Sequence, residues 1–144
     1  MATDAPRLPR AYGLGALAGA ATALAYAALA EGLGLTFGLL AVGFFGGMLI
    51  GSTVARGAWR DQDHQTVHSV QGGALAIALL AWACGVILAF VVSQALLPQA
   101  ATPLLERLSL DNSVRYFFGL DGVIQLVHLA SLAAMAVMAW RGAR

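Results

Sequence analysis

Apolar residues fill four long stretches of the chain, and polar residues gather between them. Each stretch has about the 20 residues that a helix needs to cross a bilayer. The expected spans cover residues 11–31, 33–55, 69–97 and 120–140. Strands of a membrane barrel alternate apolar and polar positions, whereas these runs are continuous. The pattern predicts an all-α, polytopic membrane protein with four transmembrane helices in a single domain, residues 1–144.

The segments between the spans predict how the helices connect. Residues 1–10 form a polar tail, and the two-residue connection "EG" (31–32) predicts a tight antiparallel hairpin of the first two helices. A polar loop follows at 56–68 and a mixed loop at 98–119.

The loop at 98–119 is expected to contain a short amphipathic interfacial helix between the third and fourth spans. Thr102-Pro103 is a favourable helix start. Leu104, Leu105 and Leu108 share one face, opposite Glu106, as in helices that lie on a membrane surface. The segment "SLDNS" (109–113) is expected to end this helix.

Arginine placement predicts the orientation. If four spans alternate, six arginines fall on one side: Arg7, Arg10, Arg56, Arg60, Arg141 and Arg144. Only Arg107 and Arg115 fall on the other side. Basic residues are enriched in cytoplasmic segments. We therefore expect a multi-pass protein of a prokaryotic cytoplasmic membrane, with both termini and the 56–68 loop cytoplasmic and the 98–119 loop outside.

A second interpretation of the first segment stays open. Arg7 and Arg10, the apolar stretch and "ALA" at 28–30 together resemble a secretory signal with a small-residue cleavage site. Cleavage there would leave three spans. The apolar stretch is longer than the 7–15 residues usual in a signal, which favours a membrane span.

Composition agrees with a membrane protein and excludes some functions. The chain is 60% hydrophobic and 10% charged, against about 25% charged in soluble domains. Its net charge of +1 gives no basic excess for nucleic acid. Cys84 is the only cysteine, so the chain has no internal disulfide and no cysteine-based zinc site. In its apolar run we expect a buried thiol.

Glycines are spaced for close helix packing. Gly43, Gly47 and Gly51 repeat every four residues in the second span. Gly34 and Gly38 form a further pair that would point to the opposite face, and Gly15 and Gly19 form a matching pair in the first span. Such spacing lets helix backbones approach closely in lipid. It predicts intrachain packing or contact with a partner protein or a second copy.

A polar stripe crosses the start of the fourth span. Asp121, Gln125 and His128 are spaced i, i+4 and i+7, which places them on one helix face. Gln94 is expected at a depth similar to Asp121. Polar groups at such depth should face the bundle or a water-filled cavity. The stripe therefore predicts interhelical hydrogen bonds or an outward-opening proton or solute path.

A second polar series, "HQTVHSVQ", opens the third helix. His64, His68 and Gln71 are also spaced i, i+4 and i+7. Two histidines so spaced can bind a metal with a third ligand, and Asp61 and Asp63 lie nearby. A zinc-protease helix would need Glu after the first His, where Gln65 stands. We interpret the series as a polar helix start in cytoplasmic water, and predict no metal site.

The sequence predicts no cofactor, no catalytic residue and no nucleic-acid partner. Ionisable groups are few, whereas small-residue helix faces are abundant. The favoured hypothesis is a non-catalytic small subunit or accessory protein of a larger membrane complex. A transporter or channel component using the polar stripe is the alternative, and an outer-leaflet membrane enzyme is the third.

Topology is the first testable prediction. Reporter domains fused after Arg144 and inserted in the 98–119 loop should report opposite sides of the membrane, because the arginines are distributed unequally. Compartment-specific enzymatic reporters measure this directly. Equal sidedness at the two positions would contradict the four-span topology.

Overall fold

The computed structural model describes residues 8–58, 64–96 and 107–144, with only the backbone for 64–66. In chain order the helices are α1 (Leu8–Ala27), the π-helix η1 (Ala28–Gly32), α2 (Gly38–Ala58), α3 (His64–Leu96), α5 (Leu110–Gly119) and α6 (Gly122–Gly142). Four stretches are long and apolar enough to cross a membrane: Leu8–Gly32, Gly38–Ala58, Val67–Leu96 and Gly122–Gly142. The predicted all-α fold with four candidate spans, and a short helix between the third and fourth, is confirmed.

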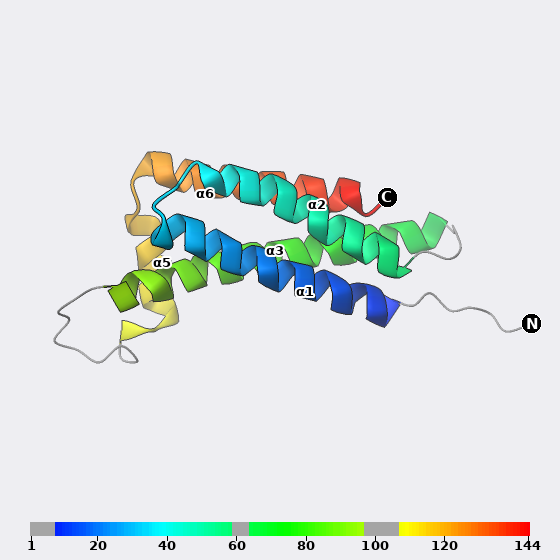
Figure 1. Cartoon of the computed structure of the whole chain (residues 1–144), viewed down its shortest axis with the longest axis horizontal. Coiled ribbons are helices and arrows are strands. Elements are labelled where there is room, and N and C mark those ends of the chain that lie inside the picture. The colour runs from blue at the N-terminus through cyan, green and yellow to red at the C-terminus, as the bar shows by residue number, and fades with distance from the viewer. Residues whose placement is uncertain (1–7, 59–63, 97–106) are drawn as a thin grey trace, which may run out of the picture.

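The four long helices run side by side, and α5 crosses one end of the bundle nearly at right angles to them (Figure 1). The start of α1 and the end of α6 lie together at the opposite end. We call these the α5 end and the terminal end. Arg10, Arg56 and Arg141 stand near the helix ends at the terminal end, and Arg107 and Arg115 lie at the α5 end.

The first two spans lie antiparallel as the predicted hairpin requires (Figure 1), but their connection comes after the predicted residues 31–32. The helix continues through the π-turn η1 to Gly32, and α2 begins only at Gly38. The Leu33 amide donates to the Ala28 carbonyl, 3.0 Å away. Gly34 lies in the connection with φ of 61°, a left-handed conformation that favours glycine. The prediction that Gly34 and Gly38 form one helix face is therefore wrong, because Gly34 lies in the turn before α2.

The segment Ser109–Ser113 was expected to break a helix. Arg107 is helical, whereas Leu108 and Ser109 are not, but the segment also begins a second helix, α5, which the sequence did not predict. Ser109 is the N-cap of α5, and its hydroxyl accepts a hydrogen bond from the Asn112 amide at 3.1 Å. Serine is among the best N-cap residues, and Asp111 in the first turn suits the helix dipole. Of the helix predicted around Leu104 and Leu108, residues up to 106 lie outside the described part.

Glycines of α2 lie directly against the backbone of α6. A Cβ built on Gly43 would lie 3.0 Å from Ser131 Cα, and one on Gly47 would lie 2.8 Å from Met135 Cα. At Gly51 it would lie 2.9 Å from the Gly142 carbonyl carbon. No side chain fits at these distances. The α2 and α6 backbones therefore approach as closely as helices can.

The α1 helix uses glycine against side chains of its neighbours. A Cβ on Gly15 would collide with Val54 of α2, and one on Gly19 would lie 3.1 Å from Ile77 Cγ2 of α3. Gly38 has only ordinary contacts, with Leu29 and Leu35 as its neighbours. Cys84, expected to be buried, is exposed on α3. Its position faces outward because the α1 residues beside it are too small to cover it.

Replacing Gly47 should test the close approach of α2 and α6. We expect Gly47→Ala to lower the free energy of unfolding by about 1–3 kcal/mol, as overpacking typically does, because its Cβ would meet the α6 backbone. Gly72→Ala is the matched control: it is also helical, but no atom lies within 4 Å of its Cβ position. Thermal unfolding in detergent measures both, and equal stability of the two variants would contradict the packing.

Candidate functional site

A buried polar cluster joins α1 to α6 in the half of the bundle nearer to α5. The Tyr26 hydroxyl lies 2.6 Å from His128 Nδ1 and 3.0 Å from the Ser131 hydroxyl. The exposed fractions of Tyr26, His128 and Ser131 are 0%, 2% and 0%. Ser131 also donates to the His128 carbonyl at 2.7 Å. The Tyr26 phenol of α1 thus contacts two polar side chains of α6.

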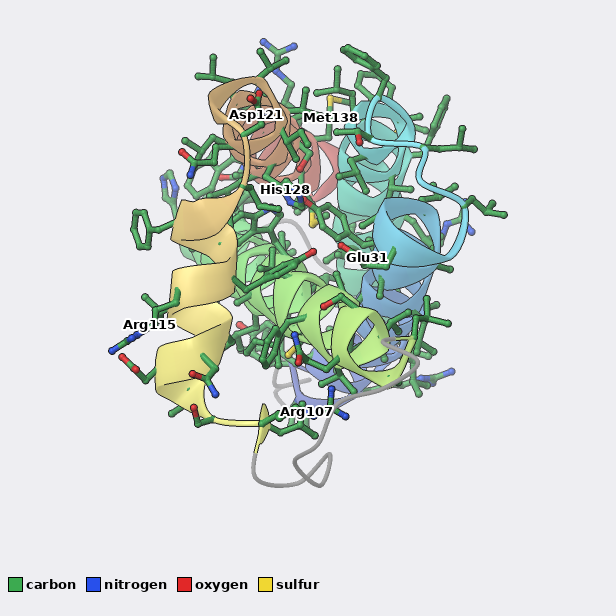
Figure 2. All side chains as sticks on the ribbon, turned by 90° about the vertical axis from the view of Figure 1, so that its left-hand side faces the viewer. Glu31, Arg107, Arg115, Asp121, His128 and Met138 are labelled. Atoms are coloured by element: carbon green, nitrogen blue, oxygen red, sulfur yellow. The ribbon has the colours of Figure 1, made fainter. Side chains whose placement is uncertain are left out.

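Aromatic side chains surround this cluster. Trp82 of α3 donates from Nε1 to the His128 carbonyl at 3.1 Å. Phe117 of α5 packs edge-on against both Trp82 and His128, with ring centroids 5.9 Å apart in each pair. The Tyr26 and His128 rings are 5.6 Å apart. Figure 2 looks along the bundle from the α5 end and shows His128 in its interior.

A second polar contact ties α5 to the end of α1. The Tyr116 hydroxyl donates to the Glu31 carboxylate, and the Tyr116 ring packs on Phe90 of α3 with centroids 5.5 Å apart. Glu31 reaches α5 from within the π-turn η1, a type of turn that often occurs at functional sites. Burial raises the pKa of Tyr116 well above its usual range, and its hydrogen bond to Glu31 raises the pKa further. Tyr116 is therefore a protonated donor at any physiological pH.

The residues Asp121, Gln125 and His128 of the predicted stripe have three different structural roles. Asp121 is exposed and is the N-cap of α6, accepting from the Val123 amide at 2.9 Å. The Gln125 amide nitrogen lies 3.0–3.2 Å from three carbonyls at the end of α5, those of Phe117, Phe118 and Leu120. His128 alone enters the buried cluster.

Gln94 does not join the stripe through any hydrogen bond that the described residues show. Its backbone carbonyl accepts from Arg107 Nη1 at 3.0 Å. This contact links the end of α3 to the residues before α5. Gln94 therefore belongs with the attachment of α5.

The polar residues at the start of α3 differ in burial. Gln71 is 4% exposed, and its side-chain amide lies 3.5 Å from the Trp140 carbonyl of α6. His68 is exposed, and the side chain of His64 lies outside the described part, as do Asp61 and Asp63. Within the described residues, no three His, Cys, Asp or Glu side chains gather as a metal site would require.

Sequence reasoning missed the partners of His128. Tyr26 was an available signal, because its phenol lies within an alanine-rich span where it needs a partner. Trp82 offered the same signal in the third span. Tyr116 and Glu31 could not be paired in advance, because the π-turn and the true position of α5 decide their contact.

The chemistry open to the cluster is limited by its connections. Ser131 meets the phenol of Tyr26 and not the imidazole, so the cluster lacks the serine–histidine contact of an activated nucleophile. The phenol and imidazole can exchange a hydrogen-bond proton, and both are shielded by Phe117 and Trp82. The arrangement suits a structural polar contact or the inner end of a proton path.

Comparison of the chain with protein-family models, with curated proteins and with solved structures gives no match. The fold and the contacts above define the class, a possible four-span integral membrane protein. The inference of function therefore rests on these contacts alone.

Substitutions at His128 should separate hydrogen bonding from packing. We expect His128→Gln to unfold near the wild-type temperature, because the amide can still bond to Tyr26. His128→Leu should lose about 0.6–1.7 kcal/mol, the range measured for hydrogen bonds between membrane helices. Detergent unfolding assays compare the two. Equal losses in both variants would show that the Tyr26 contact contributes nothing.

Proposed function

We propose that this chain is a small, non-catalytic subunit or accessory protein of a larger membrane complex. The observation that carries the proposal is how the protein uses its own intramembrane polar groups. Tyr26, His128 and Ser131 bond to one another, and Gln125 binds the end of α5. An enzyme or channel needs polar groups that face a substrate or water, whereas these hold helices together.

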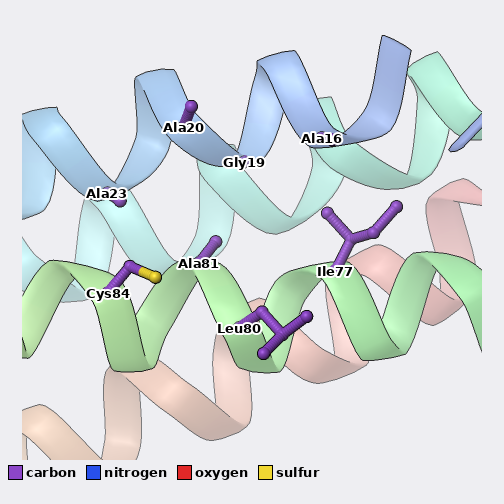
Figure 3. A pocket seen from close by; sticks show the side chains of 8 residues that line it. All are labelled: Ala16, Gly19, Ala20, Ala23, Ile77, Leu80, Ala81 and Cys84. Carbon is purple, nitrogen blue, oxygen red and sulfur yellow. The ribbon is translucent and has the colours of Figure 1, made fainter. Parts of the chain in front are cut away.

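A partner surface is supported by a hollow on the outside of the bundle. A groove of about 210 Å³ lies between α1 and α3 (Figure 3). Its lining residues are Ala16, Gly19, Ala20, Ala23, Ile77, Leu80, Ala81 and Cys84. Small residues on α1 let another helix approach its backbone, and dispersion then favours association within lipid. We propose that a transmembrane helix of the partner occupies this groove.

Cys84 makes the proposed interface testable without adding a label site. In native membranes a membrane-permeable maleimide should react slowly with Cys84, because the partner helix covers it. Dissociation in detergent should restore fast reaction. Native mass spectrometry from membranes should show a complex heavier than one 14.8 kDa chain.

Ala20→Leu and Ala25→Leu form the matched pair for this experiment. Both alanines are exposed on α1, but only Ala20 lines the groove. Ala20→Leu should reduce the complex and leave thermal unfolding of the chain unchanged, whereas Ala25→Leu should keep the complex. A single-chain mass, together with Cys84 that reacts equally fast in membranes and detergent, would overturn the proposal.

A transporter or channel component is the second candidate, favoured by the Tyr26–His128 contact. The phenol and the imidazole could pass a proton between them, and Glu31 with Tyr116 lies toward the α5 end. Proton flux into liposomes tests this: His128→Gln should abolish flux with the fold intact, because an amide does not titrate near neutral pH. Absence of flux in the wild-type protein would exclude this candidate.

A further inference from the structure

The α5 helix carries an apolar row that no described residue of the bundle covers. Leu110, Val114 and Phe118 are 77%, 53% and 73% exposed, and they follow one another at every fourth position. The adjacent positions of α5 carry an exposed ion pair between Asp111 and Arg115, with 2.8 Å between Oδ2 and Nε. The helix therefore has exposed apolar side chains in addition to those that contact the bundle.

Contacts between the spans give the depth of α5. At the terminal end, the Tyr12 hydroxyl binds the Ser69 carbonyl, and Tyr12 is the kind of residue that marks a membrane boundary. At about 1.5 Å per residue, the helix from Tyr12 to Glu31 is about 28 Å long, close to the thickness of about 30 Å of a hydrocarbon core. Because Tyr116 binds Glu31, α5 lies at the second boundary.

The contacts of Tyr116 and Phe117 also determine how α5 is rotated about its own axis. Tyr116 meets Glu31 at the boundary, whereas Phe117 reaches deeper, to His128 and Trp82. His128 lies in the second turn of α6, about 9 Å below its first residue. The deep side of α5 is therefore the side of Phe117.

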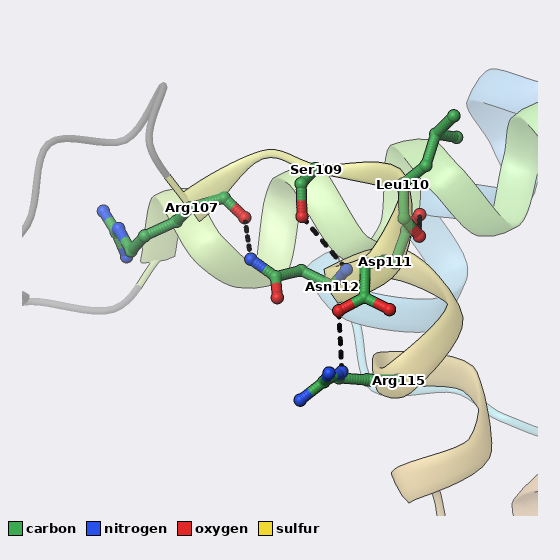
Figure 4. A network of polar contacts seen from close by, with 7 residues as sticks. Arg107, Ser109, Leu110, Asp111, Asn112 and Arg115 are labelled. Carbon is green, nitrogen blue, oxygen red and sulfur yellow. Dashed lines mark hydrogen bonds and ion pairs between the residues drawn. The ribbon is translucent and has the colours of Figure 1, made fainter.

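Leu110 and Val114 of this row lie on the deep side, whereas Phe118 lies about a quarter-turn away from Phe117. Leu110 and Val114 precede Phe117 by seven and three positions, a spacing that puts all three on one helix face. Asp111 and Arg115 lie about a quarter-turn further round, and Figure 2 shows Arg115 pointing away from the bundle. Figure 4 shows the ion pair near the start of α5, close to the hydrogen bond that the Asn112 side-chain amide donates to the Arg107 carbonyl.

We propose that α5 binds the bilayer at its end of the protein, with Leu110 and Val114 among the acyl chains and the Asp111–Arg115 pair at the level of the headgroups. The helix lies across the bundle axis (Figure 1), which is the orientation of a helix in the membrane plane. The spans also expose apolar side chains, such as Leu17 of α1, 70% exposed.

A soluble partner protein fits this surface less well than lipid does. Such a partner would approach from the water, on the side that we assign to Asp111 and Arg115, whereas Leu110 and Val114 share the deep face of Phe117. The proposal does not depend on a partner at the α1–α3 groove, because that groove lies elsewhere on the bundle.

Site-directed spin labelling in liposomes tests the proposal on the full chain. In a Cys84→Ala background, nitroxides are attached in turn at Leu110→Cys, Val114→Cys, Asp111→Cys and Arg115→Cys, all at exposed positions. Collisions with oxygen report lipid and collisions with a water-soluble nickel complex report water. A label at Leu17→Cys, on the exposed surface of α1, gives the lipid reference.

The expected result is a reversal between neighbouring positions. Labels at 110 and 114 should collide with oxygen as the lipid reference does, and labels at 111 and 115 should collide mainly with nickel. Nickel access at all four positions would place α5 in water and overturn the proposal. Shielding of 110 and 114 from both reagents would also overturn it, because a protein would then cover the row.

Discussion

Polar groups within a bilayer must find their partners inside the protein, and this constraint organises one half of the bundle. Tyr26 of α1 satisfies this constraint by forming hydrogen bonds with both His128 and Ser131 of α6. Trp82 meets it by donating to the carbonyl of His128. Three helices are thereby held together around one phenol, in a region where apolar side chains gain nothing by leaving lipid.

The glycines of α2 make this arrangement geometrically accessible. Gly43 lies against the backbone of Ser131, the residue whose hydroxyl meets Tyr26 from the other side. A larger residue at position 43 would push α6 away from α2 and shift Ser131 with it. Close backbone contact with α2 and hydrogen bonding with α1 are therefore coupled through Ser131. Gly46 extends the effect to α1, because Thr22 occupies the space where its side chain would be.

The span pattern was predictable because a bilayer demands about 20 apolar residues per helix, whatever the tertiary contacts are. Helix ends were harder, since they depend on local geometry. Glu31 and Gly32 read as a connection because they are polar and flexible, yet a π-turn keeps both in the helix. Ser109 read as a helix breaker because serine favours caps and loops, and it is indeed a cap, at the beginning of α5. The polar stripe that begins at Asp121 was predictable from the sequence. The separate roles of its residues were not, because they depend on where α5 ends.

The α3 helix separates the two surfaces to which we assign binding. Ile77, Leu80 and Cys84 are spaced three and four residues apart and share one face, which lines the groove beside α1. Trp82 and Phe90 lie on another face, where they hold Phe117 and Tyr116 of α5. Lipid at α5 and a partner helix at the groove would therefore meet different sides of the same helix. Phe117 of α5 packs against Trp82 and His128, which belong to the Tyr26–His128 cluster and its surroundings. A movement of α5 relative to the bilayer would therefore displace this cluster first. It would affect the groove only through α3.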